Sequence, residues 1–375
     1  MRVGFLSSSN YFSKDAFSGI LYSMHAALRR RGIEVVDLGW PIRPGLRAKI
    51  RRRLRRGLSL DLTRPTFPTE RSRFAQQVRR QLTKTPCDVL FAPVGSAEID
   101  AVTGPEPVVY NSDATFELLS AHYDLNLTDA QRSECDRLEQ AAISRARHIV
   151  YSSTWAADSA VKRYGAHPER VSVIQFGANM EVVPPGESVL GRCDDRKCRL
   201  LFVGRDFKRK GGSYALEALE ALRRRGVDAH LVILGSVPPT APSSNEVEVI
   251  PYLDKNNPAD VRRIYDLYMG SHYLLFPTRA DCSPIALCEA AAFGLPVVSS
   301  QVGGIASIVS EGENGFLLPL DADANAYADR IESSFADRER YRQLVLSSRS
   351  RYDALLNWDR WAERLEPVLR QAAST

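Results

Sequence analysis

The sequence predicts an α/β protein made of two Rossmann-like domains, each with a doubly wound parallel sheet. Its 375 residues are more than one ordinary domain needs. Short apolar runs alternate with helical segments up to residue 174, and the same alternation starts again at residue 200. The stretch between them, from residue 178 to 199, is rich in proline and charge, which is typical of a linker.

The first half begins with an apolar run at residues 3–6, as expected for a strand that is buried on both faces. Apolar residues then recur at helical spacing from Ile20 to Leu28, and Gly32 ends this helix. Similar runs predict strands at 35–38, 88–92, 107–110, 148–151 and 171–174, with helices that end near residue 146 and span 155–164. This order is a repeated strand and helix, which predicts a parallel sheet.

The second half repeats this pattern. Apolar runs predict strands at 200–203, 229–234, 247–250, 273–276 and 296–298, and helices at 214–225, 258–269, 284–293 and 324–350. The resulting boundaries are an N-terminal domain at 1–180, a linker at 181–199, a C-terminal domain at 200–355 and a C-terminal helix at 356–375. For this last helix we also consider a return to the N-terminal domain.

The composition is that of a globular protein, with 44% hydrophobic and 25% charged residues. The first apolar run is too short for a signal peptide, and no segment is suited to span a bilayer, so we expect a cytoplasmic protein. Six irregularly spaced cysteines indicate free thiols. Neither the cysteines nor the histidines have the spacing of metal ligands, and we predict no metal site.

A basic tract at residues 43–56 contains eight Lys or Arg residues and no acidic residue. Leu46, Ile50, Leu54 and Leu58 recur every four residues, which predicts a helix with one narrow apolar stripe. Such a helix suits peripheral contact with an anionic membrane, here the inner face. The alternative is a surface helix packed on the N-terminal sheet with solvated arginines. Because no aromatic residues are interleaved, we do not expect nucleic-acid binding.

The loop at residues 204–212 follows a predicted strand and opens a helix. It contains glycines together with Arg205 and Lys210. Freed backbone amides, a helix N-terminus and fixed cations favour binding of a diphosphate. The alternative is a solvated basic turn.

A second loop, at residues 279–289, carries two carboxylates. Asp281 precedes a predicted helix, and Glu289 lies about one turn inside it among small apolar residues. A carboxylate in such surroundings needs a partner, and the hydroxyls of a sugar are natural partners. The alternative is that Glu289 pairs with a basic residue of the protein.

Two further segments give weaker signals. Ser18 and Gly19 open the first helix, where a glycine allows a ligand to approach the backbone, but the G-x-G-x-x-G pattern is absent. Asp321 and Asp323 form a D-x-D pattern, and the position before a helix that starts near residue 324 predicts a helix cap rather than a metal site.

The segment from Asp281 to Glu289, followed by residues 290–298, resembles the E-x7-E segment of the retaining family-four glycosyltransferases of the GT-B fold. Gly204-Arg205 and Lys210-Gly211 are similar to the phosphate-binding Arg and Lys of that family. Residues 152–179 resemble the stretch that closes its N-terminal domain.

The resemblance implies two domains that face each other across a cleft, with the acceptor on the N-terminal side and the donor on the C-terminal side. It implies a retaining, metal-independent hexosyltransferase that uses a nucleoside-diphosphate sugar and needs no cofactor. The acceptor is left unidentified, and so is the choice between UDP and GDP. The alternatives are a nucleotide-sugar 2-epimerase, or a non-catalytic protein that binds a nucleotide sugar or nucleic acid.

The resemblance also implies a role for single residues. Glu289 binds the ribose, Asp281 binds hydroxyls of the donor sugar, and Arg205 and Lys210 stabilise the leaving diphosphate. Gly19 lies near the same phosphates. Backbone amides after Asp281 meet the phosphate or sugar, and the substrate-binding segment comprises Cys282, Ser283, Pro284 and Ile285.

Two positions depart from the family pattern. Asp281 replaces a glutamate and is one methylene shorter. Asp113 stands where the family commonly has a histidine, and as a hydrogen-bond acceptor it is assigned here to the donor sugar.

Overall fold

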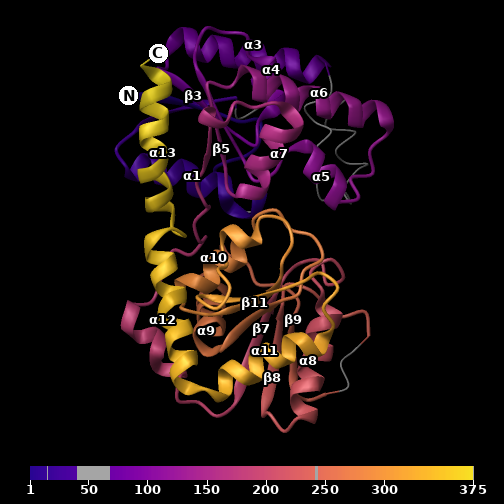
Figure 1. The fold of residues 1–375 in the computed structure, drawn as a ribbon. Helices are drawn as coiled ribbons and strands as arrows, with labels where there is room; N and C mark the ends of the chain where they lie inside the picture. Colours follow the sequence, from indigo (N-terminus) through magenta and orange to yellow (C-terminus); the bar gives the residue numbers. More distant parts are fainter. Residues whose placement is uncertain (15, 40–67, 241–243, 375) are drawn as a thin grey trace. The chain divides into compact units, whose positions relative to one another are not determined.

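The computed structural model describes residues 1–14, 16–39, 68–240 and 244–374. The chain divides into two compact units, each with its own sheet (Figure 1). The N-terminal unit comprises Met1–Ile174 and Ala362–Thr375, and the C-terminal unit comprises Gln175–Trp361. The basic tract at residues 43–56 lies outside the described residues.

The sheet of the N-terminal unit has six parallel strands in the order β2-β1-β3-β4-β5-β6. The strands are β1 (Arg2–Leu6), β2 (Glu34–Leu38), β3 (Val89–Pro93), β4 (Val108–Ser112), β5 (His148–Tyr151) and β6 (Val171–Val173). The helices are η1 (Ala16–Gly19), α1 (Ile20–Arg30), α3 (Pro68–Lys84), α4 (Ser96–Ala101), α5 (Phe116–His122), α6 (Asp129–Arg145), α7 (Thr154–Tyr164) and η3 (Pro168–Arg170). The order changes direction between β1 and β3.

The sheet of the C-terminal unit also has six parallel strands, in the order β12-β11-β10-β7-β8-β9. The strands are β7 (Cys198–Val203), β8 (Ala229–Leu234), β9 (Val247–Ile250), β10 (Tyr273–Phe276), β11 (Val297–Ser300) and β12 (Gly315–Leu318). The helices are η4 (Gly186–Arg192), α8 (Gly212–Arg224), α9 (Pro258–Gly270), α10 (Ile285–Ala292), η5 (Ile305–Ser307), α11 (Ala324–Ala336) and α12 (Arg338–Ala354). Here the change of direction lies between β7 and β10. The last helix, α13 (Trp358–Ala373), contributes residues to both units.

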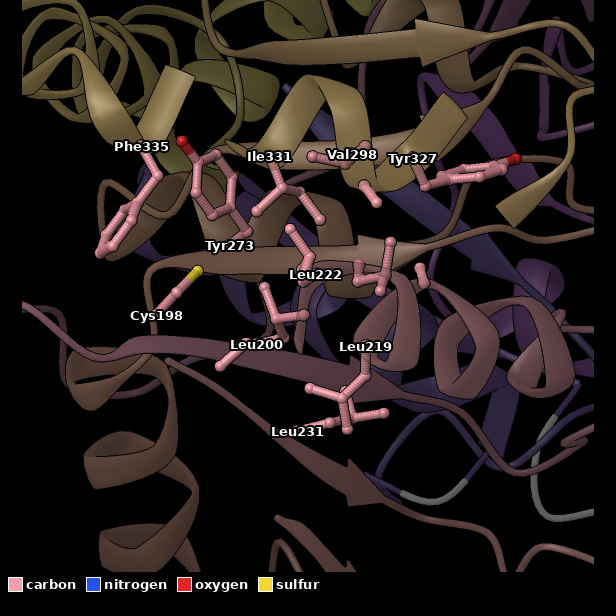
Figure 2. Packing of buried hydrophobic residues seen from close by; sticks show 14 of the residues in the cluster. Cys198, Leu200, Leu219, Leu222, Leu231, Tyr273, Val298, Tyr327, Ile331 and Phe335 are labelled. Atoms are coloured by element: carbon pink, nitrogen blue, oxygen red, sulfur yellow. The ribbon is translucent and has the colours of Figure 1, made fainter. Parts of the chain in front are cut away.

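Both faces of this second sheet are covered, as the alternation of side chains along β7 shows. Leu200 and Phe202 pack with residues of α8 and α11, whereas Leu201 packs on the opposite face with residues of α9 and α10. Figure 2 shows the first of these two layers, where Leu200 and Leu222 lie close to Ile331. The predicted fold class, with two doubly wound parallel sheets, is confirmed.

One predicted element differs from the structure, and one strand and three α-helices were not predicted. The expected single helix at 324–350 is two helices, because Asp337 is extended and caps α12 by accepting a hydrogen bond from the backbone N–H of Arg340 at 3.1 Å. Strand β12 was not predicted. Helices α3, α4 and α5 were also not predicted.

The segment at 181–199, assigned to a linker by its composition, lies within the C-terminal unit. Arg192 at the end of η4 is buried and donates hydrogen bonds to the carbonyl oxygens of Tyr268 (3.2 Å), Ser271 (2.7 Å) and Phe293 (2.7 Å). One charged side chain of this segment, that of Arg192, is therefore buried and bound by carbonyl groups of the C-terminal unit.

Helix α13 begins in the C-terminal unit, and its residues from Ala362 onward belong to the N-terminal unit. There Glu366 forms an ion pair with Arg31 at 2.7 Å, and Arg364 donates to the carbonyl oxygen of Val173 at 2.9 Å. Among the described residues, no helix combines the length and apolarity needed to cross a bilayer.

Candidate active site

Two loops meet where the strand order of the C-terminal sheet reverses. One follows β7 and the other follows β10, and these strands are neighbours. Ligands of doubly wound sheets bind at such a point, outside the carboxyl ends of the strands. The loops approach closely, since a Cβ on Gly211 would collide with the carbonyl oxygen of Pro277. Gly211 also has a φ of +75°, which favours glycine.

The two loops bring the predicted cation and the first predicted carboxylate together. The Lys210 Nζ lies 2.9 Å from Oδ1 and 2.7 Å from Oδ2 of Asp281. The side chains are only 13% and 10% exposed. The hydroxyl of Thr278 donates to Oδ2 of Asp281 at 2.8 Å. The guanidinium of Arg209 lies 3.6 Å from the same oxygen and donates to the carbonyl oxygen of Ala280 at 2.6 Å.

Burial acts on the charge of Lys210. Removal from water lowers the pKa of this ammonium, while Asp281 acts in the opposite direction, and the net pKa is lowered from the ordinary value. The Nζ also lies 4.6 Å from the centre of the Phe276 ring, which favours the cation. Lys210 is therefore a cation in a dry environment, where its interaction with an anion is stronger than in water.

The second carboxylate, Glu289, is buried on α10. Its Oε1 lies 2.5 Å from the Nζ of Lys255, and its Oε2 accepts a hydrogen bond from the hydroxyl of Tyr268 at 3.0 Å. Burial and the neighbouring Glu289 raise the pKa of Tyr268 well above its usual value, so its hydroxyl stays protonated and donates. The pairing with a basic residue that the sequence left open is thus present, and the partner is Lys255.

Arg205 lies in the same loop as Lys210 but is exposed, with its guanidinium 6.0 Å from the centre of the Tyr252 ring. Tyr252 is itself 57% exposed. This part of the site therefore offers a solvated cation and an open aromatic face.

The segment Cys282, Ser283, Pro284 and Ile285 leads from Asp281 into α10, which begins at Ile285. Its backbone is fixed from the neighbouring loop, because Gly304 donates to the carbonyl oxygen of Cys282 at 2.9 Å. The first amides of a helix have no partner within the helix and carry partial positive charge, so this end of α10 is suited to anionic or hydroxyl oxygens.

Gly19 and Asp113 belong to the N-terminal unit. Gly19 has a φ of +80° and directly precedes α1, and Phe17 and Ser18 before it also have positive φ values. Asp113 is half-buried and follows β4 at its carboxyl end. Both residues therefore lie at ends of elements where ligands of parallel sheets bind.

The D-x-D pattern at Asp321 and Asp323 has a structural role at the start of α11. Asp323 caps α11 by accepting a hydrogen bond from the backbone N–H of Ala326 at 3.0 Å, so the predicted helix cap is confirmed. In the part of the chain that the structure describes, no three His, Cys, Asp or Glu side chains are grouped so that they could hold a metal ion.

Sequence reasoning missed Lys255, Tyr268 and Thr278. Lys255 and Tyr268 are 34 and 21 residues from Glu289, so their meeting depends on the sheet topology. Thr278 lies three residues before Asp281 and is the first polar residue after the apolar run of β10, which is a signal that could have been used.

Two family models match the chain. The model described as "Glycosyl transferases group 1" matches residues 197–337, and the model described as "Glycosyltransferase Family 4" matches residues 20–182. The first match contains Lys210, Asp281 and Glu289.

Relatives among curated proteins include a D-inositol 3-phosphate glycosyltransferase of Corynebacterium diphtheriae, which is 27% identical over 288 residues. This alignment covers 71% of the chain and 66% of the relative. An alpha-maltose-1-phosphate synthase of Mycolicibacterium smegmatis is 27% identical over 259 residues, covering 63% of the chain and 66% of the relative. The chain thus spans just under two thirds of the length of these relatives.

Solved structures share the fold. A sucrose-phosphate synthase from Thermosynechococcus elongatus superposes with a TM-score of 0.72 at 17% identity, covering 100% of this chain and 99% of the other. The Anabaena protein HepE in complex with UDP-glucose has a TM-score of 0.61 at 15% identity, covering 99% and 100%. At these identities the likeness establishes the two-sheet architecture.

Proposed function

We infer that this chain, which belongs to the family-four glycosyltransferases of the GT-B fold, moves a hexose from a nucleoside-diphosphate sugar to an acceptor hydroxyl. We propose that the reaction retains the anomeric configuration and uses no metal or other cofactor. The observation that carries this proposal is the arrangement at the switch point of the C-terminal sheet. A nearly buried lysine and an exposed arginine lie on the loop after β7, and the neighbouring strand β10 leads to Asp281, which pairs with this lysine, and to a helix that carries a buried glutamate.

The proposed role of Arg205 and Lys210 is to bind the diphosphate and to stabilise the charge that develops when it leaves. Fixed cations in a water-poor site need no reorganisation during the reaction. Lys210 is nearly buried in the loop after β7, whereas Arg205 in the same loop is exposed to solvent. The amides of Cys282 and Ser283 and of the first residues of α10 are proposed to meet the phosphate or sugar.

Glu289 is proposed to accept hydrogen bonds from the two ribose hydroxyls. Its ion-pair partner Lys255 is 39% exposed, so the lysine can return to water when the ribose arrives. Tyr268 keeps its hydrogen bond to Oε2 and holds the carboxylate in place. For the N-terminal unit we propose that Asp113 accepts a hydrogen bond from the donor sugar and that Gly19 lies near the phosphates.

The test is incubation of the protein with UDP- and GDP-hexoses. Binding to the folded state raises the melting temperature, so a thermal-shift screen identifies the donor first. With that donor and a panel of acceptors, we expect release of the free nucleoside diphosphate and a glycosylated product. An isomerised sugar nucleotide instead of a free diphosphate identifies a 2-epimerase, and binding without any conversion identifies a non-catalytic protein.

Dialysis against EDTA is expected to leave the rate of transfer unchanged within about twofold, because Arg205 and Lys210 supply the positive charge at the diphosphate. The measurement compares initial rates after dialysis with and without the chelator. A loss of activity that Mg²⁺ or Mn²⁺ restores contradicts the proposal.

A peripheral membrane contact through residues 43–56 is a separate proposal, supported by their eight cationic side chains. Each Lys or Arg near an anionic surface contributes on the order of 1 kcal/mol, and salt screens this attraction. We expect co-sedimentation with anionic liposomes at low salt and release at high salt. Protein that stays in the supernatant at low salt shows that the tract is only a solvated face.

A further inference from the structure

Glu139 is a carboxyl group in the interior of the N-terminal unit. It lies on α6 and is only 3% exposed. Tyr110 of β4 and Tyr151 of β5, which interact with it, belong to the same apolar cluster as Ala142 of α6. The proposed function gives Glu139 no role, although a buried carboxyl group needs a physical reason.

The groups that bind Glu139 are neutral. The hydroxyl of Tyr110 lies 3.1 Å from each of the two carboxyl oxygens and donates to them. Ser96 on α4 and Tyr151 are further hydroxyl groups that interact with the carboxyl group. In the part of the chain that the structure describes, no Lys, Arg or His pairs with it. An ionised Glu139 would thus be a buried charge without a counter-ion, which is a costly arrangement.

A neighbouring charge also disfavours the ionised form of Glu139. Asp136 lies about one turn earlier on α6, and its negative charge opposes ionisation of Glu139. Asp136 pairs with Arg163 at 2.9 Å and accepts the hydroxyl of Tyr164 at 2.7 Å. The cation Arg163 is therefore engaged by Asp136 and does not neutralise Glu139.

The other titratable groups that face Glu139 stay uncharged near neutral pH. Burial raises the pKa values of Tyr110 and Tyr151 well above their usual range. Burial also raises the pKa of Tyr164 on α7, and it raises that of Cys135 on α6 to about 11. A titration in this cluster near neutral pH therefore belongs to Glu139.

The protonation of Glu139 has a definite effect on stability. Burial raises its pKa from the ordinary value of 4.5 to about 7, and the hydrogen bond from Tyr110 offsets only part of this rise. Between these two values the folded protein holds a proton that the unfolded chain has released. The stabilisation that this proton provides is complete below about pH 4.5 and is lost as the pH rises through about 7.

We propose that Glu139 is a pH switch of the N-terminal unit, in which a neutral acid buried between α6 and β4 keeps these elements packed and loss of its proton loosens them. The proposal is independent of the proposed function, because proton uptake and stability are measured without substrate. Tyr110 lies three residues before Asp113, so loosening at Glu139 would reach the loop that is assigned above to the donor sugar.

The first test observes the proton directly. Infrared difference spectra of the substrate-free protein between about pH 6 and pH 8 report protonated carboxyl groups, and ordinary Asp and Glu side chains are already ionised in this range. We expect the carbonyl band of a protonated acid to disappear as the pH rises, and to be absent from Glu139→Gln. Identical difference spectra of the wild type and Glu139→Gln overturn the proposal.

Glu98→Gln is the matched control for this band. Glu98 on α4 is also a buried carboxyl group of the N-terminal unit, and burial raises its pKa as well. Its Oε1 accepts a hydrogen bond from the backbone N–H of Ser8 at 3.2 Å. We expect the band to remain in Glu98→Gln. If it disappears there and remains in Glu139→Gln, it belongs to Glu98 and the proposal is wrong.

The second test measures the loosening itself. Because a chain of two units does not unfold in one step, amide hydrogen exchange is read locally in β4 and α6. The wild type and Glu139→Gln are compared at the same pH, which removes the intrinsic pH dependence of exchange. We expect the opening constant of the wild type, relative to that of the variant, to rise about tenfold or more between about pH 5 and pH 8. A ratio that does not change with pH overturns the proposal. Asp158→Asn, an exposed change on α7, is expected to keep the wild-type dependence.

Tyr110→Phe is the second variant, for the case that Glu139→Gln does not fold. It retains Glu139 and the aromatic ring and removes only the hydroxyl that favours the ionised carboxylate. We expect the carbonyl band to titrate about one pH unit higher, because loss of this hydrogen bond favours the neutral acid. A midpoint that stays in place or moves to lower pH overturns the proposal.

Discussion

Lys210→Ala is expected to lower kcat by roughly 10²-fold or more, because removal of one group that stabilises charge in the transition state has an effect of this size. Lys210 is the least solvated cation of the site and lies on the loop at the strand switch. The measurement is the initial rate at saturating donor, divided by the amount of folded protein. Arg205→Ala is expected to act in the same direction.

The matched control is Lys208→Ala, an exposed lysine two residues away in the same loop. It removes the same charge from the same segment, so unchanged kcat there shows that position, and not net charge, is decisive. Lys210→Ala also leaves Asp281 buried without its ammonium, and a lower melting temperature is expected. A rise in KM with unchanged kcat would show that Lys210 binds the ground state only.

Several elements of the fold were predictable from the sequence to the residue. The strands at 148–151, 229–234 and 273–276 were predicted with the observed bounds, since each is a short apolar run buried between two helical layers. Such strands can be recognised from their own hydrophobic residues, even when the neighbouring strands are not known.

The missed elements lack this signal. Helix α3 has mostly polar side chains, and α4 is only six residues long, so helical periodicity has little room to show. Strand β12 contains a glycine and follows a turn. The boundary at Asp337 is a helix cap within a long amphipathic stretch, and the periodicity of hydrophobic residues alone does not reveal it.

In the candidate site, too, some features could be predicted from the sequence and others could not. Lys210 and Asp281 could be selected because each follows a strand in a loop that opens a helix, and Glu289 because it is a lone carboxylate among small apolar residues of the helix that follows. The ion pairs between them and with Lys255 could not, since they join residues 71 and 34 positions apart. Charge at a loop is visible in a sequence, whereas the identity of its partner is decided by which strands are neighbours.

Glu289→Ala is expected to abolish transfer. A buried carboxylate that accepts two ribose hydroxyls makes two charged hydrogen bonds, each contributing about 1.5 to 3 kcal/mol. Their loss corresponds to a decrease of roughly 10²- to 10⁴-fold in kcat/KM for the donor. The measurement is formation of product over a range of donor concentrations, together with the melting temperature of the variant.

Two variants separate the ribose contact from the packing around it. Tyr268→Phe removes the hydroxyl that holds Oε2 while keeping the ring, so a smaller loss than in Glu289→Ala is expected. Glu248→Ala removes an exposed carboxylate whose partner is Arg263 at 3.1 Å, and full activity is expected there. Normal turnover by a folded Glu289→Ala protein contradicts the ribose assignment. In that case the carboxylate would interact only with Lys255 and Tyr268 and would have a structural role.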